Sequence, residues 1–257
     1  MECEMMCILF AAYDIHPDYR LIIAANRDEF YGRPAERAHF WDDEPTILAG
    51  RDLQKMGTWM GMTTRGRFAA LTNYRDPVQD TRNKQSRGHI VRDFLTENSE
   101  PKDFLIDLQK QRTQYQGFNV LVADDQTLMY YSNVENKIKS LKPGLYGLSN
   151  HLLDTPLRKV EKGTAYMKHL LSTRKTIDKE DLFRILADEE LVSKEQLPNT
   201  GVPIDLEEKL SAIFIQTPEY GTRCSTVITI DREGAVTFTE RTFPNPQENE
   251  VSYEFRI

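Results

Sequence analysis

The stretch CILFAAYDIHPDYRLIIAANRDEF, residues 7–30, decides the fold. Two apolar runs, CILFAAYD and YRLIIAAN, have strand-like composition, and the IHPD between them contains Pro17 and Asp18, which favour a turn. The stretch therefore predicts an antiparallel hairpin. Its first strand begins at Cys7, and its second strand ends in the polar residues 26–29.

The rest of the chain alternates between strand-like and helical blocks. GTWMGMTT and RFAALTNY flank a glycine-containing turn and predict a second hairpin. Two helical segments follow Ser86, and the strand pattern returns in FNVLVAD, TLMYYSN and LYGLSN. Residues 157–175 and 178–190 predict a second helix pair, the latter with Asp178 as N-cap. SAIFIQ, STVITID, AVTFTERTF and VSYEFRI predict closing strands.

Two regions lack a clear helical or strand pattern. RDEFYGRPAERAHFW predicts an ordered loop, and residues 191–208 predict a long connection. The order of the remaining elements fits an α+β fold, and a four-layer αββα sandwich of two antiparallel sheets between helix pairs would use them all. A chain of 257 residues can form a single domain of this kind, so we expect one domain over 1–257.

The composition argues against several classes of function. Apolar content is 39% and charged content 28%, as in ordinary globular proteins. The net charge of −7 gives no global field to attract nucleic acid or an anionic membrane. No apolar run is long enough to span a bilayer and no secretion signal precedes the first strand, so we expect a cytoplasmic protein. The three cysteines have neither zinc nor haem-attachment spacing, and we expect no cofactor.

Cys7 is the first candidate for chemistry because it follows a methionine. If Met6 is the initiator and is trimmed, Cys7 carries a free α-amine with a reference pKa of ~8, which can serve as a general base for its own thiol. On this interpretation residues 1–6 are an extension or a propeptide. If the chain keeps Met1, Cys7 is an interior residue, and a cysteine at the head of an apolar strand then has a structural role.

The polar residues at the end of the hairpin include Arg27 and Asp28. A carboxylate there can orient the amine or thiol of Cys7 across the hairpin, or the segment can be a solvated turn with a surface ion pair. Arg223 lies ahead of a later strand, where its guanidinium can bind or hold a carboxylate, or simply lie at the surface.

Two asparagines each follow an apolar strand. Asn73 ends LTN and Asn150 ends GLSN, and an amide at a strand end can donate a hydrogen bond to a developing oxyanion. Asparagine is also common in turns because it tolerates left-handed backbone. Spacing alone favours the turn.

Four segments resemble signature blocks of one family. AANRDEFYGRPAERAHFW, GTWMGMTTRGRFAALTNYRDP, GLYGLSNHLLDTPLRKV and YGTRCSTVITIDREGAVTFTER are similar, in order, to those of the NRDE family, the transport and Golgi organisation protein 2 family. The resemblance covers nearly the whole chain from Met6 and implies an N-terminal-nucleophile hydrolase fold. It also implies that Cys7 is the nucleophile, that Asn73 and Asn150 are oxyanion and amine-orienting residues, and that Arg27, Asp28 and Arg223 complete the site.

The resemblance leaves two functions open. The first is cleavage of a linear amide or related acyl bond of a small molecule by Cys7. The second is a non-catalytic protein on the same scaffold that binds and carries haem, a lipid or acyl-coenzyme A, since relatives in eukaryotes are linked to haem and lipid homeostasis. Similarity of fold does not choose between them. One departure from the family is MECEM ahead of the expected Met-Cys start.

Overall fold

A computed structural model describes residues 7–75, 83–197, 203–244 and 249–257. The chain divides into two compact units. Unit 1 contains the described residues up to Gly32 together with Pro143–Ser149 and Leu153–Glu254, and unit 2 contains Arg33–Lys142, Asn150–Leu152 and Phe255–Ile257. The proposed 1–6 extension lies outside the described residues, and the single-domain interpretation stays a prediction.

Unit 1 is built on a six-stranded sheet of order β10-β1-β2-β11-β12-β13, and the neighbouring pairs from β10 to β12 are antiparallel. The predicted hairpin is confirmed as β1 and β2, the two strands next to β10 and β11. The strands of this sheet are β1 Cys7–Tyr13, β2 Tyr19–Phe30, β10 Gly144–Leu148, β11 Tyr220–Asp231, β12 Ala235–Thr242 and β13 Glu250–Arg256.

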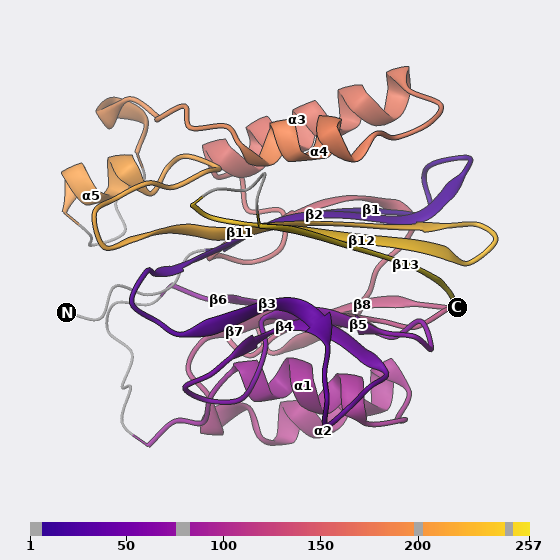
Figure 1. The fold of residues 1–257 in the computed structure, drawn as a ribbon. Coiled ribbons are helices and arrows are strands. Elements are labelled where there is room, and N and C mark those ends of the chain that lie inside the picture. The colour runs from indigo at the N-terminus through magenta and orange to yellow at the C-terminus, as the bar shows by residue number, and fades with distance from the viewer. Residues whose placement is uncertain (1–6, 76–82, 198–202, 245–248) are drawn as a thin grey trace. The chain divides into compact units, whose positions relative to one another are not determined.

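Two helices, α3 Arg158–Thr173 and α4 Lys179–Leu186, cover one face of this sheet (Figure 1). Alternate residues of β1 and β2, including Ile8, Phe10 and Ala24, form a buried cluster with apolar side chains of both helices. In α3, Gly163 permits the close approach, because a Cβ there would lie 2.0 Å from the ring of Phe10. The predicted N-cap of α4 is confirmed, since the Asp178 side chain accepts a hydrogen bond from the Glu180 N–H. Alternation along β1 therefore places Cys7 on the face away from this cluster.

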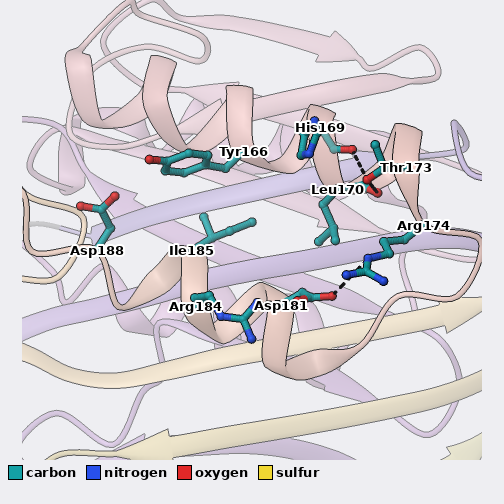
Figure 2. A pocket seen from close by; sticks show the side chains of 9 residues that line it. All are labelled: Tyr166, His169, Leu170, Thr173, Arg174, Asp181, Arg184, Ile185 and Asp188. Atoms are coloured by element: carbon teal, nitrogen blue, oxygen red, sulfur yellow. Dashed lines mark hydrogen bonds and ion pairs between the residues drawn. The ribbon is translucent and has the colours of Figure 1, made fainter.

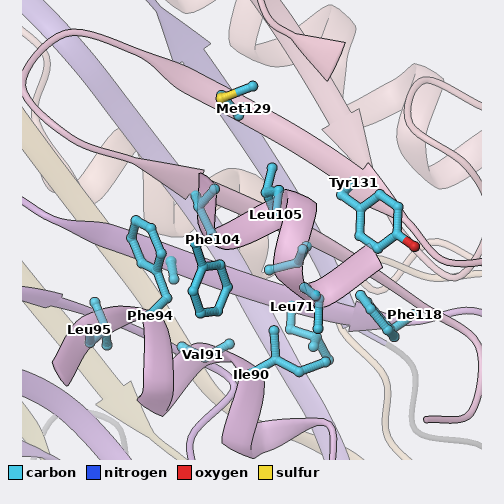
Figure 3. Packing of buried hydrophobic residues seen from close by; sticks show 14 of the residues in the cluster. Leu71, Ile90, Val91, Phe94, Leu95, Phe104, Leu105, Phe118, Met129 and Tyr131 are labelled. Carbon is cyan, nitrogen blue, oxygen red and sulfur yellow. The ribbon is translucent and has the colours of Figure 1, made fainter. Parts of the chain in front are cut away.

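Unit 2 is a seven-stranded antiparallel meander, β3 to β9 in chain order. Helices α1 Gly88–Thr96 and α2 Pro101–Lys110 pack on it through a cluster that includes Phe94 and Phe104, whose rings meet edge to face at 5.1 Å (Figure 3). Its strands are β3 Ala35–Phe40, β4 Ile47–Asp52, β5 Met60–Thr63, β6 Phe68–Asn73, β7 Phe118–Ala123, β8 Leu128–Ser132 and β9 Lys137–Ser140.

The structure corrects three sequence predictions. The expected loop RDEFYGRPAERAHFW contains the end of β2 and all of β3, whose adjacent charged residues Glu36 and Arg37 obscured the strand pattern. The expected strand SAIFIQ is not a strand: its apolar residues are buried, but its sheet pairing is an isolated bridge from Gln216 to Gly221. The expected connection 191–208 includes the 3-10 helix η2 Lys194–Gln196 and the short helix α5 Ile204–Lys209, while 198–202 lie outside the described residues. Within the described ranges, no helix combines the length and hydrophobicity that a membrane crossing requires.

Candidate active site

Cys7 is the first residue of β1, and only 5% of it is exposed. It pairs with Arg27 on β2. Because Cys7 is the first residue of β1, its backbone nitrogen lies at the N-terminal end of that strand. Its carbonyl oxygen accepts a hydrogen bond of 2.9 Å from the Ser149 hydroxyl, directly after β10. The backbone of Cys7 is therefore held from both neighbouring strands. Sequence reasoning did not single out Ser149, because a serine after a strand carries no distinctive signal.

The Cys7 thiol is held in its neutral form. Burial raises its pKa to about 12, and the nearby negative charge of Asp28 acts in the same direction. A hydrogen bond from the Asp28 backbone N–H and the charge of Arg27 only partly oppose this. The thiolate is the reactive form of cysteine, so this thiol needs a base within reach to act as a nucleophile at neutral pH.

Asp28 is fully buried near the end of β2. Its Oδ1 accepts a hydrogen bond of 2.6 Å from the Thr222 hydroxyl, and its Oδ2 has no hydrogen-bond partner among the described residues. Burial raises the pKa of this carboxyl to about 7, although the charges of Lys159 and Arg27 and the Thr222 hydrogen bond favour the carboxylate. A buried carboxylate oxygen without a partner is costly, which is typical of a group that awaits a ligand or takes part in catalysis.

Arg223 occupies a β-bulge beside Asp28. Along the β11–β2 ladder, Thr222 pairs with Asp28 and Cys224 pairs with Arg27, which leaves Arg223 as the extra residue. Its guanidinium donates to the Phe30 carbonyl at 2.8 Å, and burial together with the charge of Arg27 lowers its pKa. Bulges redirect side chains and are common next to active sites.

The interpretation of residues 26–29 as a solvated turn is wrong, because they continue β2 and three of the four are buried. Arg27 contacts Glu29 at 3.4 Å, with only 11% and 1% of the two side chains exposed. Asn26 has a structural role: its Nδ2 donates to the carbonyls of Leu186 and Ile213, both at 2.9 Å. The motif thus combines one residue that anchors β2 with others that lie beside Cys7.

The structure brings Asn73 and Asn150 together within unit 2. Asn73 is the last residue of β6, and its carbonyl accepts a 3.0 Å hydrogen bond from the Asn150 side-chain amide. The Asn150 carbonyl accepts from the Arg75 N–H at 2.8 Å. Neither asparagine has a positive φ, so the left-handed turn interpretation is wrong. Both side chains are buried and can present amide groups as hydrogen-bond donors.

A buried network supports this pair. Asn119 on β7 donates to the Thr72 hydroxyl at 3.2 Å and to the His151 carbonyl at 2.9 Å, and accepts from the Tyr130 hydroxyl at 2.7 Å. The network therefore ties His151, the residue after Asn150, to strand β7 of the seven-stranded sheet. The six predicted residues fall into two groups: Cys7, Arg27, Asp28 and Arg223 lie in unit 1, and Asn73 and Asn150 lie in unit 2.

A groove of about 710 Å³ lies elsewhere, between α3 and α4 of unit 1 (Figure 2). Figure 2 shows its mixed lining, in which Asp181 lies between Arg174 and Arg184 and the apolar floor comes from Leu170 and Ile185. None of the six predicted residues lines it. The described ranges also hold no cluster of three or more histidine, cysteine or acidic side chains that could hold a metal ion.

Comparison with solved structures identifies the class of fold. The chain is similar to a mutant conjugated bile acid hydrolase from Clostridium perfringens, with a TM-score of 0.54 and 10% identity over 98% of this chain and 92% of that one. It is also similar to the Caenorhabditis elegans ortholog of N-acylethanolamine-hydrolyzing acid amidase, with a TM-score of 0.51 and 11% identity over 98% and 100%. The predicted α+β class, with the N-terminal-nucleophile hydrolase fold, is confirmed.

The chain belongs to the Transport and Golgi organisation 2 family, whose model matches residues 6–245. It is 38% identical to the Transport and Golgi organization protein 2 homolog of Bos taurus over 98% of this chain and 99% of that protein. It is 39% identical to the Homo sapiens homolog over 92% of each. The family predicted from the signature blocks is confirmed.

Proposed function

We propose that this protein is a cysteine N-terminal-nucleophile hydrolase that cleaves a linear amide or a related acyl bond of a small molecule. The proposal depends chiefly on one observation: Cys7 heads a strand beside a buried Asp28 whose Oδ2 has no partner among the described residues. If Cys7 is the mature first residue, its α-ammonium supplies a donor and a compensating positive charge for that oxygen. The match of the family model from residue 6 supports Cys7 as the mature terminus.

The proposed reaction uses the two parts of Cys7 together. The neutral form of the α-amine, in equilibrium with the ammonium form that Asp28 holds, takes the thiol proton as the sulfur attacks the substrate carbonyl, and a carbon–sulfur bond forms. Preorganised hydrogen-bond donors would stabilise the oxyanion; the assignment of Asn73 and Asn150, which lie in unit 2, to the oxyanion and amine-orienting roles stays a prediction from the family resemblance. The carbon–nitrogen bond then breaks, and the protonated amine returns its proton to the leaving nitrogen. Water hydrolyses the thioester and regenerates the thiol.

The charged residues have distinct proposed roles. Asp28 holds the amine of Cys7 in place, while Arg27 and Arg223 hold the substrate or the carboxylates of the site. The names of the two structural relatives, a bile acid hydrolase and an acid amidase, are consistent with amide cleavage but show the fold alone. A cytoplasmic location remains a prediction from the sequence.

The test is acylation of Cys7 by an alkyne-tagged β-lactone, with the modified residue located by mass spectrometry. We expect modification at Cys7 in a chain that begins there and none at any residue in Cys7→Ala. Cys224→Ala is the matched control, since Cys224 is the other buried free cysteine in the described part of the chain, and it should keep full modification. Equal modification of the parent and Cys7→Ala would favour the ligand-carrying alternative instead.

A further inference from the structure

We propose that Thr222 is a positioning residue that fixes the carboxylate of Asp28, so that one oxygen is occupied and the other is left to accept the α-ammonium of Cys7. The second half of this inference rests on the proposed function. The first half does not, because it concerns a hydrogen bond between two side chains of the folded chain.

The geometry assigns the direction of the hydrogen bond. The Thr222 hydroxyl oxygen accepts from the backbone N–H of Ile215 at 3.0 Å and lies 2.6 Å from Asp28 Oδ1. A hydroxyl has one proton, and the ionised form of Asp28 can only accept, so in that form the proton of Thr222 points to Asp28. The bond joins a charged acceptor to a buried donor, which is the stronger class of hydrogen bond.

Thr222 is itself held rigidly. Its backbone N–H donates to the Ile215 carbonyl at 2.8 Å, so Thr222 and Ile215 exchange two hydrogen bonds. Gly221 makes room for this contact, since a Cβ there would lie 2.4 Å from the Ile215 carbonyl oxygen and 2.3 Å from the Tyr31 hydroxyl. Thr222 also pairs directly with Asp28 in the sheet, immediately before the bulge at Arg223. The hydroxyl therefore has a fixed position from which to orient the carboxylate.

Other groups act on Asp28 through charge. Lys159 of α3 and Arg27 of β2 favour the carboxylate. Burial raises the pKa of Cys7 of β1 and of Tyr31, which follows β2, and the charge of Asp28 acts in the same direction on both. Lys159 donates to the Leu210 carbonyl at 3.2 Å, which ties its ammonium to the end of α5. Thr222 is the group for which a hydrogen bond to a specific oxygen of Asp28 is seen.

The test is the titration of Asp28 in the full chain, followed by the carboxyl carbon signal of labelled aspartate and assigned by its loss in Asp28→Asn. Thr222→Val removes the donor, so the Asp28 midpoint should rise by about one pKa unit, a tenfold change in acid dissociation. Thr222→Ser keeps the hydroxyl and should restore the parent midpoint. The matched control is Thr226→Val, a buried threonine of the same strand whose hydroxyl meets Glu240 instead, and it should leave Asp28 unchanged.

An unchanged midpoint in Thr222→Val, or an equal rise in the Val and Ser variants, would overturn the proposal. If Thr222→Val does not fold, Thr222→Ala provides a second variant without the hydroxyl, and the same comparison with Thr222→Ser applies. The titration does not need acylation of Cys7. If the β-lactone does not acylate Cys7 but the Asp28 midpoint shifts in Thr222→Val, the hydrolase proposal is rejected and the role of Thr222 stands. If Cys7 is acylated but the midpoint does not shift, the role of Thr222 is rejected and the hydrolase proposal stands.

Discussion

Asn26 and Asp28 are two buried polar residues on one strand, and they differ in how fully they are hydrogen-bonded. Asn26 donates to the Leu186 and Ile213 carbonyls and accepts from the Ser225 hydroxyl at 2.6 Å. Asp28 is equally buried but leaves Oδ2 without a partner among the described residues. A buried polar residue that maintains the fold needs a hydrogen-bond partner for each of its polar atoms. A buried charged group that lacks such a partner indicates a functional position.

The comparison predicts the largest effect on stability at Asn26. Asn26→Leu leaves two carbonyls and one hydroxyl buried without their partner, so the free energy of unfolding should fall by about 4 kcal/mol. Urea denaturation followed by circular dichroism measures this loss. A loss below about 1 kcal/mol would contradict the structural role of Asn26.

Asp28 should behave in the opposite way. Asp28→Asn removes a buried charge and keeps the shape, so the stability at neutral pH should stay within about 1 kcal/mol of the parent or increase. The β-lactone acylation of a chain that begins at Cys7 should fall by about 100-fold, because its amine loses a positioned carboxylate. If the variant loses stability and keeps its acylation rate, Asp28 belongs with Asn26 as a structural residue.

The pH dependence of stability sharpens the contrast. The pKa of Asp28 is about 7 in the folded chain and ~3.9 when unfolded, so between these values only the folded state keeps the proton. The free energy of unfolding contributed by Asp28 therefore falls as pH rises through this window. The free energy of unfolding of Asp28→Asn, taken relative to that of the parent, should therefore rise by on the order of 2 kcal/mol from about pH 5 to pH 8.

Denaturation at these two pH values measures that gain. A chain that begins at Cys7 should show a smaller pH dependence, because the α-ammonium lowers the pKa of Asp28. A parent and an Asp28→Asn variant with the same pH dependence would show that Asp28 titrates normally in the folded chain.

The smallest effect is expected at Ser149. Ser149→Ala removes the hydrogen bond to the Cys7 carbonyl and should cost about 1 kcal/mol of stability, the usual value for one such bond. Urea denaturation checks it, with Ser172→Ala as the control, since that exposed hydroxyl donates only within its own helix. A loss as large as that of Asn26→Leu would place Ser149 among the principal anchors of the fold.

The sequence predicts the parts of the fold that have a clear period. The β1–β2 hairpin and the four long helices follow from alternation, helical spacing and an N-cap, so their positions are close to those found. Strand β3 is missed because the adjacent charged residues Glu36 and Arg37 interrupt its alternation, and SAIFIQ is mistaken for a strand because burial alone gives the same apolar run.

The candidate site divides in the same way. Cys7, Asp28 and Arg223 can be proposed from strand ends and from the family resemblance. The roles of Asn26 and Thr222 cannot, because they depend on partners about 160 to 194 residues away in the chain. Nothing in the local sequence distinguishes an asparagine that binds two distant carbonyls from one that faces a substrate. The bulge at Arg223 is equally invisible, since it arises from the register between β11 and β2.

The proposed chemistry requires that Cys7 act with its own α-amine beside Asp28. The most direct measurement compares the β-lactone acylation rates of two chains that differ only at this terminus, one beginning at Cys7 and one retaining residues 1–6, each verified by intact mass. We expect a rate at least about 100-fold higher for the chain that begins at Cys7, because only that chain has the base. Equal rates would contradict it and would remove the basis for N-terminal nucleophile catalysis in this protein.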